Sequence, residues 1–401
     1  MKLHHVCIIL SIIVFACSKE KKETNISIGK IDSLHSNILN EDRKIWVYLP
    51  ASYADTSKHY PVVYLLDGDS HFHAVTGLVK QLSGNTLCPE MIVVAIPNTD
   101  RTRDLTPTRS LVLPGGEERA FLKSSGGGEN FTAFIEKELI PYVESHYHTA
   151  PHRVLIGHSF GGLFAVNTLI HHPHIFDSYL AIDPSLWWDG GKLMLQSDSV
   201  FRTKKFDDKT LFVSVANTMS PGMDTLQASS DTSGTTEHIR SIIRFSKIAV
   251  ARKAGSGLTF GWKYYNEDDH GSVPLISEYD ALRFMFSYYR LPEDPDPTID
   301  KFTEHFKTVS AKLGYAMLPP EERINQAGYY FLGEKKFDRA FTFFDYNIKT
   351  YPGSQNVFDS MGDYYLAVSD TTKAIESFKK ALTIVEVEAT RTKLNELEKK
   401  K

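Results

Sequence analysis

The chain has 401 residues, of which 42% are hydrophobic and 23% are charged, and its formal net charge is −4. This composition is typical of a globular protein that is long enough for more than one domain. Because the charge gives no overall basic surface, nucleic acid is not expected as a partner, and small or neutral substrates fit better.

The amino-terminal residues predict a cleaved export signal. A lysine at position 2 leads into an apolar run that is too short to span a bilayer and suits a signal peptide. The segment resembles a bacterial lipoprotein signal, in which the small Ala16 precedes a lipidated Cys17. It predicts a signal peptide over residues 1–17, a polar tether over 18–25, and a lipid-anchored protein on the periplasmic or outer-membrane face of the cell envelope. An ordinary secretory signal is the alternative.

Cysteine usage predicts no disulfide. Removal of the signal removes Cys7, lipidation uses Cys17, and Cys88 then remains as the single free thiol, which we expect to be structural. No histidine and cysteine cluster has metal-ligand spacing, and the His-rich residues 171–174 suit a solvated helix end. We therefore expect neither a metal nor a cofactor.

Short apolar runs alternate with helical stretches, which predicts an α/β fold with a mostly parallel sheet. The expected strands are Lys44–Leu49, Tyr60–Leu66, Met91–Ile96, Arg153–Ile156, Tyr179–Ile182, Leu211–Val215 and Thr259–Tyr265. The first two are expected to form an antiparallel start. The expected helices are Asn130–His146, Gly161–His171, Thr236–Ala254 and Pro274–Tyr289.

Three prolines within residues 292–297 mark the expected end of the first domain, because proline cannot continue a helix. The predicted division is a catalytic domain over residues 26–291, a linker with a helix over 292–320, and a repeat segment over 321–395.

The repeat segment has a period of 34 residues. The matched pairs are Ile324 and Phe358, Gly328 and Gly362, Phe331 and Tyr365, Ala340 and Ala374, and Phe344 and Phe378. The period and residue types resemble the tetratricopeptide repeat, in which small residues let paired helices approach. A protein partner bound by these repeats and packing against the first domain are both open readings.

A Gly-x-Ser-x-Gly motif stands between a predicted strand and a predicted helix. It reads Gly157-His158-Ser159-Phe160-Gly161. A serine on such a strained turn is exposed at the edge of the sheet, and neighbouring side chains would collide with the backbone there. Ser159 is therefore the candidate nucleophile.

A candidate catalytic histidine follows the last predicted strand. His270 lies on the loop between that strand and a helix, where it would reach the serine hydroxyl. The order of serine, acid and histidine along the chain is the one that the hydrolase interpretation requires.

Four segments together carry a family resemblance. They are Tyr60–Asp69, the Gly-His-Ser-Phe-Gly-Gly motif, Asp183–Trp188 and Asp269–Pro274. Over about residues 26–291 the chain is similar to the putative-esterase family of α/β-hydrolases, which includes feruloyl and acetylxylan esterases, ferric-siderophore esterases and S-formylglutathione hydrolases. The resemblance implies an α/β-hydrolase fold followed by a small all-α repeat domain, with Ser159 as nucleophile and His270 as general base.

The acid of the triad is expected on the loop after the Leu211–Val215 strand. Asp224 is our choice there, although family members place a glutamate nearer the strand. Glu267, Asp268 and Asp269 compete with Asp224, and a Ser-His dyad is also open.

Further site residues follow from the same reasoning. The backbone amide of Phe160 and an amide of the loop at Asp69 are expected to form the oxyanion hole. Trp187 or its neighbour Trp188 is expected to wall the site, while core packing takes the other. Arg101 and Arg103 are candidates for binding an anionic substrate group, and anchoring of their loop by an Arg/Asp pair is the alternative.

The sequence thus predicts a cofactor-free serine carboxylesterase that cleaves esters by acyl transfer, with carbohydrate-linked acyl groups as a substrate class. A ferric-siderophore esterase is the nearest alternative and would need arginines at the pocket, for which Arg43 and Arg109 are further candidates. An acyltransferase, and a binding protein with a retired hydrolase domain and an active repeat module, are the other readings.

Overall fold

The computed structural model describes residues 25–114 and 116–399. The predicted signal peptide, Cys17 and most of the predicted tether lie outside the described residues. Within the described ranges, no helix is long and apolar enough to cross a membrane.

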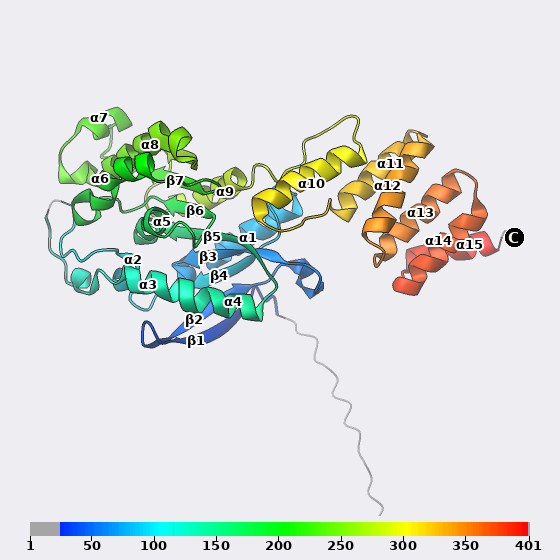
Figure 1. Cartoon of the computed structure of the whole chain (residues 1–401), viewed down its shortest axis with the longest axis horizontal. Coiled ribbons are helices and arrows are strands. Elements are labelled where there is room, and N and C mark those ends of the chain that lie inside the picture. Colours follow the sequence, from blue (N-terminus) through cyan, green and yellow to red (C-terminus); the bar gives the residue numbers. More distant parts are fainter. Residues whose placement is uncertain (1–24, 115, 400–401) are drawn as a thin grey trace, which may run out of the picture.

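An eight-stranded sheet forms the centre of the larger domain (Figure 1). Its strands are β1 (Lys30–Ser36), β2 (Glu41–Tyr48), β3 (Tyr60–Leu66), β4 (Ile92–Ile96), β5 (Thr149–His158), β6 (Ser178–Ile182), β7 (Thr210–Ala216) and β8 (Thr259–Tyr265). They lie in the order β1-β2-β4-β3-β5-β6-β7-β8. The pairs β1–β2 and β2–β4 are antiparallel, and all the others are parallel.

Both faces of the sheet are covered. Because side chains alternate along a strand, Val62, Tyr64 and Leu66 of β3 enter one apolar cluster while Val63 and Leu65 enter the other. This explains why the central strands appear in the sequence as continuous apolar runs.

The helices and helical turns are arranged around this sheet and beyond it. They are η1 (Ala51–Ala54), α1 (Gly68–Gly84), α2 (Arg101–Leu105), η2 (Ala120–Ser124), α3 (Gly128–Phe134), the π-helical turn η3 (Ile135–Leu139), α4 (Ile140–His146), α5 (Phe160–His171), α6 (Trp188–Thr203), α7 (Thr225–Ser230), η4 (Gly234–Thr236), α8 (Glu237–Ser256), α9 (Val273–Met285), α10 (Ile299–Leu313), α11 (Glu321–Gly333), α12 (Phe337–Thr350), α13 (Gln355–Ala367), α14 (Thr371–Ile384) and α15 (Glu388–Glu398). One apolar cluster packs α1, α9 and α10 against the sheet. The other packs α3, α4, α5, α6 and α8 against it. The α/β-hydrolase fold predicted from the sequence is confirmed.

Two details of the sheet differ from the sequence prediction. Strand β1 was not predicted, because it is an edge strand with mostly polar side chains and a largely exposed surface. The expected antiparallel partners β2 and β3 are not neighbours, since β4 lies between them. The antiparallel start of the sheet is instead the β1–β2 hairpin.

The carboxyl-terminal segment is entirely helical and forms a repeat of helix pairs. A Cβ atom added at Gly328 would lie 2.6 Å from the ring of Phe344, and one added at Gly362 would lie 2.4 Å from the ring of Phe378. The same glycine-to-phenylalanine contact thus recurs after 34 residues, which accounts physically for the period in the sequence. The assignment to the tetratricopeptide class stays a prediction.

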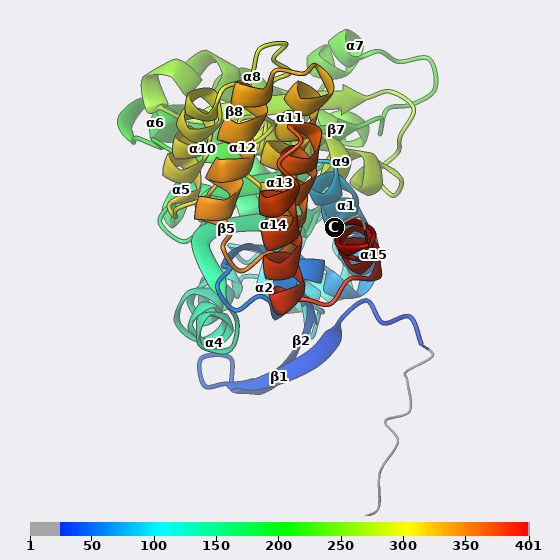
Figure 2. The same cartoon turned by 90° about the vertical axis from the view of Figure 1, so that its right-hand side faces the viewer.

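Helix α10 links the two parts of the molecule. Its Phe306, Val309 and Leu313 pack in a core cluster of the sheet domain, and its Phe302 packs with the first repeat. Figure 1 shows α11 to α15 extending as a row from α10, and Figure 2, seen from the end of that row, shows these helices in front of the sheet domain.

Candidate active site

Ser159 lies at the turn between β5 and α5, at the carboxyl edge of the sheet. Its backbone has φ 59° and ψ −112°, in the left-handed region that a residue with a side chain rarely adopts. Such a conformation costs on the order of 1–3 kcal/mol and persists only where its surroundings enforce it. Here the Ser159 amide donates to the carbonyl of Ile182 at 2.9 Å, and its carbonyl accepts from Leu163 and Ser185. The turn has the strained strand-to-helix geometry that the sequence predicts for a nucleophile elbow.

The elbow needs glycine at position 157. A Cβ atom there would lie 2.3 Å from the backbone carbonyl of Gly161, and backbone atoms cannot rotate away. We expect Gly157→Ala to destabilise the protein by about 3 kcal/mol or more and to abolish activity, because the strained turn cannot close. Thermal unfolding would measure this. Gly77→Ala is the matched control, since a Cβ atom at Gly77 has nothing within 4 Å, and an equal effect of both substitutions would contradict the steric account.

His270 faces a buried carboxylate that the sequence analysis did not assign. Its Nδ1 lies 2.6 Å from Oδ2 of Asp183, which is the first residue after β6 and is fully buried. The structure thus brings the predicted base to the edge of the sheet and pairs it with an acid from the loop of the adjacent strand. Ser159, Asp183 and His270 also keep the order along the chain that the hydrolase interpretation requires.

Asp183 is held by three donors. Its Oδ2 also accepts from Nε2 of His238 at 2.8 Å, and its Oδ1 accepts from the amide of Ala216 at 2.9 Å. Burial alone would raise the pKa of this carboxyl, but the hydrogen bonds from His238, His270 and Ala216 outweigh burial and hold its pKa well below the usual range. Asp183 is therefore ionised and fixed in orientation. Sequence reasoning missed His238 because only the packing of α8 brings it to this site.

Asp224 does not contact His270, and the choice of Asp224 as the acid is corrected. Asp224 caps helix α7, where its carboxylate accepts from the amide of Gln227 at 2.7 Å and the Gln227 side chain bonds back to the Asp224 amide. This capping box satisfies the exposed start of a short helix.

The competing acids beside His270 are engaged in their own loop. Asp269 accepts from the amides of Gly271 and Ser272, and Asp268 accepts from the Ser272 hydroxyl. Glu267 accepts from Asn266. These contacts shape the turn that presents His270, and they leave its Nδ1 to Asp183.

Three imidazole rings lie in a row, those of His270, His158 and His71. The ring of His158 lies 4.5 Å from that of His270 and 5.8 Å from that of His71. Burial, with the neighbouring imidazoles, lowers the pKa of His158 to about 4, so this ring is neutral at pH 7. His71 lies 3.2 Å from the fully buried Glu278. His158 thus gives His270 an uncharged wall on one side.

The Ser159 hydroxyl contacts the hydroxyl of Ser185, with 3.2 Å between the two oxygens. Ser185 belongs to the same loop as Asp183, so one loop touches both the nucleophile and the base. Catalytic hydrogen bonds are often long in a structure without substrate and tighten in the complex. Transfer of the proton to His270 would require the Ser159 hydroxyl to turn from Ser185.

Two helix starts offer amides for the oxyanion hole. Phe160 begins α5, and α1 begins at Gly68 and continues with Asp69. Amides in the first turn of a helix have no partner within that helix. The side chain of Asp69 is exposed, which agrees with a contribution from its backbone alone. The loop before α1 is ordered by Asp67, whose carboxylate is bound by Arg101 and Asn98.

The two arginines that were candidates for substrate binding are engaged by carboxylates. Arg101 binds Asp67 with 2.6 and 2.9 Å contacts and also donates to the carbonyl of His158. Arg103 binds Glu41 and Asp104. Both arginines therefore match the alternative of loop anchoring. Through these contacts, Arg101 ties the loop before α1 to the elbow.

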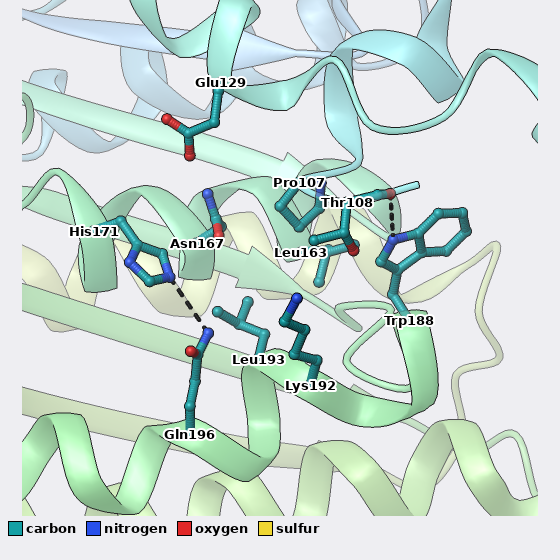
Figure 3. A pocket seen from close by; sticks show the side chains of 10 residues that line it. All are labelled: Pro107, Thr108, Glu129, Leu163, Asn167, His171, Trp188, Lys192, Leu193 and Gln196. Carbon is teal, nitrogen blue, oxygen red and sulfur yellow. Dashed lines mark hydrogen bonds between the residues drawn. The ribbon is translucent and has the colours of Figure 1, made fainter. Parts of the chain in front are cut away.

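The two tryptophans have separate places. Trp188 is buried, and its indole donates to the carbonyl of Thr108 at 3.0 Å. It lines a cavity of about 220 Å³ along α5 that Figure 3 shows from close by, with Asn167 and Leu163 on the same helix. Trp187 is half-buried, with its ring 6.1 Å from that of Phe160. Trp188 therefore belongs to the core, and Trp187 stays the candidate for the wall of the site.

Asp183, His238 and His270 are also the one group in the described ranges whose atoms lie close enough to share a metal ion, all within 4.8 Å. Their contacts of 2.6 and 2.8 Å are hydrogen-bond distances, whereas two ligands of a tetrahedral zinc lie about 3.3 Å apart. The arrangement therefore fits a proton held between base and acid better than a metal.

Cys88 has no part in this site. It is buried, and burial raises the pKa of its thiol to about 12, which keeps it protonated and unreactive.

Comparison with known proteins places this geometry in a family. The family model described as "Putative esterase" matches residues 36–236, about half of the chain. Among curated proteins, the ferri-bacillibactin esterase of Bacillus subtilis is 34% identical over 181 residues, which are 41% of this chain and 62% of that protein. A siderophore enterobactin esterase of Emericella nidulans is 31% identical over 160 residues, or 35% of this chain and 52% of that protein. The chain thus spans between about half and three fifths of the length of these relatives.

Solved structures extend the likeness over more of the chain. An IroE-like serine hydrolase from Shewanella oneidensis is 34% identical, with a TM-score of 0.68, and the match covers 79% of this chain and 97% of that one. An uncharacterised protein from Capnocytophaga ochracea shares the fold, with 15% identity and a TM-score of 0.61. The match covers 92% of this chain and 99% of that one. By the family model and the Shewanella relative, the chain belongs to the putative esterase family of α/β-hydrolases.

Proposed function

We propose that the protein is a serine carboxylesterase in which Ser159, His270 and Asp183 form the catalytic triad. The observation that carries the proposal is the 2.6 Å contact between His270 and the buried Asp183, on the same sheet edge as the strained Ser159 elbow. Burying a carboxylate is costly, so a buried carboxylate that faces Nδ1 of His270 is not expected for an ordinary surface histidine in an acidic loop.

The proposal includes the proton positions, which the contacts of Asp183 support. Asp183 is ionised and accepts the Nδ1 proton of His270, so Nε2 of that ring is free to accept a proton from Ser159. The serine oxygen then forms a bond to the ester carbonyl carbon, and the carbonyl π electrons move to the oxygen. Collapse of this intermediate breaks the bond to the alcohol, which leaves with the proton from His270. Water, deprotonated by the same base, releases the acid from the acyl-enzyme.

The negative oxygen of the intermediate would be stabilised by the amides at the starts of α5 and α1. Each removed donor of this kind typically costs about 10²–10³-fold in kcat. These donors are backbone groups, so their position depends on how closely the start of α1 packs against β4. A Cβ atom at Gly68 would lie only 2.8 Å from Ala95, so this packing requires glycine.

The relatives favour a siderophore-type ester as the substrate. The two curated proteins described above are named as esterases of ferri-bacillibactin and of enterobactin. We therefore place the siderophore alternative ahead of the carbohydrate-linked acyl groups that the sequence analysis preferred. The envelope location through a lipidated Cys17, and a protein partner for the repeats, remain proposals that rest on the sequence.

Hydrolysis of a substrate panel tests both levels of this proposal. The panel contains enterobactin, methyl ferulate, an acetylated xylo-oligosaccharide and p-nitrophenyl acetate, each measured with the wild type and with Ser159→Ala. We expect hydrolysis by the wild type alone, with kcat/KM for enterobactin at least about tenfold above that for the ferulate and acetyl-sugar esters. A preference for either of those would overturn the siderophore assignment. Equal inactivity of both proteins on all four esters would overturn the esterase.

A further inference from the structure

A second cavity, of about 350 Å³, lies between α6 and α8 and has a basic lining. Arg240, Arg244 and Lys247 line it from α8, and Trp187 and Leu195 line it from the other side. The three cations stand at i, i+4 and i+7 of one helix, so they share a face. The cavity therefore combines an apolar wall with a row of positive charge.

This positive charge is not neutralised within the protein. In the described part of the chain, the side chains of Arg244 and Lys247 have neither a hydrogen bond nor an ion pair, and Glu237 is the sole carboxylate among the lining residues. Arg240 is fixed by the carbonyls of Asp231 and Ser233, at 2.7 and 3.2 Å, which do not cancel its charge. Arg244 and Lys247 are exposed, and like charges at i, i+4 slightly disfavour a helix, so a bound anion would relieve this repulsion.

Trp187 connects the cavity to the proposed catalytic turn. Trp187 stands two positions after Ser185, whose hydroxyl contacts Ser159, and its ring lies near that of Phe160. On the other wall, Arg240 belongs to α8, the helix whose His238 binds Asp183. A group attached to an ester bound at Ser159 would thus have a short path into the cavity.

We propose that this cavity is a substrate subsite that takes an anionic group, a carboxylate or an anionic aromatic ring, carried by the ester. The inference rests on the proposed esterase function and adds the charge of its substrate. Trp187 would pack on the substrate, and Arg244 and Lys247 would pair with its charge. Recognition of an anion thereby falls to α8, because Arg101 and Arg103 are bound to carboxylates of the protein.

Two matched pairs of esters test the subsite. In the first, p-nitrophenyl valerate is compared with mono-p-nitrophenyl glutarate, which carries a carboxylate on the acyl side. In the second, phenyl acetate is compared with 4-acetoxybenzoate, which carries it on the alcohol side. The readout is the ratio of kcat/KM for the anionic ester to that for the neutral ester, measured for the wild type, Arg244→Gln and Lys247→Gln.

We expect the ratio to fall by at least about fivefold in each variant for one of the two pairs, and that pair identifies the side of the ester that enters the cavity. Lys253→Gln is the matched control, because it removes one exposed charge from α8 outside the cavity lining. Its ratio should stay within twofold of the wild type. The effect should also shrink at high salt, since screening weakens exposed charge pairs.

The failures can be told apart. Ratios that stay within twofold of the wild type in both variants, or that fall equally in Lys253→Gln, would overturn the subsite and leave the esterase standing if Ser159→Ala abolishes hydrolysis. Absence of Ser159-dependent hydrolysis of these four esters and of enterobactin would overturn the esterase and the subsite with it.

Discussion

Asp183→Asn is expected to lower kcat by about 10³–10⁴-fold with a modest change in KM. An asparagine amide facing Nδ1 of His270 favours the tautomer with its proton on Nε2, and that nitrogen can then no longer accept a proton from Ser159. Steady-state hydrolysis of p-nitrophenyl acetate measures the effect.

Asp224→Asn is the matched control, because the same chemical change there affects only the cap of α7. It should leave kcat within about twofold of the wild type, since an exposed cap acts on stability by about 1 kcal/mol. Full activity of Asp183→Asn would contradict the triad and favour a Ser-His dyad. Loss of activity in Asp224→Asn alone would restore the original assignment.

Asp183→Asn is also expected to change how the unfolding free energy depends on pH. The pKa of Asp183 is lowered in the folded state, so its ionised form stabilises the fold above the unfolded carboxyl pKa of about 3.9, and this contribution is lost as the pH falls through the folded pKa. The difference in unfolding free energy between wild type and Asp183→Asn should therefore narrow below about pH 4. Urea unfolding at pH 4.5 and pH 2.5 would show this, because an ordinary imidazole, with a pKa of about 6.5, is protonated at both values.

Ser159→Ala and His270→Ala are each expected to lower kcat by at least about 10³-fold, and the double substitution is expected to cost little more than either alone. The two residues act on one proton transfer, so removal of one leaves the other without a function. Single-turnover measurements of the two variants and the double variant would test this. Multiplicative losses would indicate that His270 acts independently of Ser159.

Much of the sheet domain could be predicted because its strands are buried on both faces. The run Tyr60–Leu66, for example, coincides with the fully buried strand β3. The β1 strand could not be recognised in the same way, since a polar edge strand lacks this signal. The pairing of β2 with β4 was also missed, because the connection from β2 to β3 is short and neighbouring strands in sequence were expected to pair.

In the site, too, the residues with a local sequence signal were predicted and the residue without one was missed. Ser159 and His270 were predicted because each has a local signal, a glycine-flanked turn and a loop after a strand. Asp183 stood in a recognised motif, but the acid was expected one strand later, after β7. Its left-handed backbone, with φ 40°, aims the carboxylate along the sheet edge, and the sequence has no marker of that conformation.

The α8 contribution to the site was beyond sequence reasoning. His238 reaches Asp183 only because α8 packs against β7 and β8, and Arg244 and Lys247 look like ordinary solvated charges until the cavity beside them is known. For Arg101 and Arg103 the sequence left substrate binding and loop anchoring open, and the structure shows carboxylate partners in Asp67 after β3, Glu41 of β2 and Asp104 of α2.

Mapping the adduct of a fluorophosphonate on the purified protein tests the central claim most directly. Such probes react with an activated serine and not with an ordinary hydroxyl. We predict one adduct per chain, located by peptide mass spectrometry at Ser159, absent from Ser159→Ala, and formed much more slowly in Asp183→Asn than in Asp224→Asn. An unlabelled Ser159 in a protein that hydrolyses esters, or an adduct at another serine, would contradict the account.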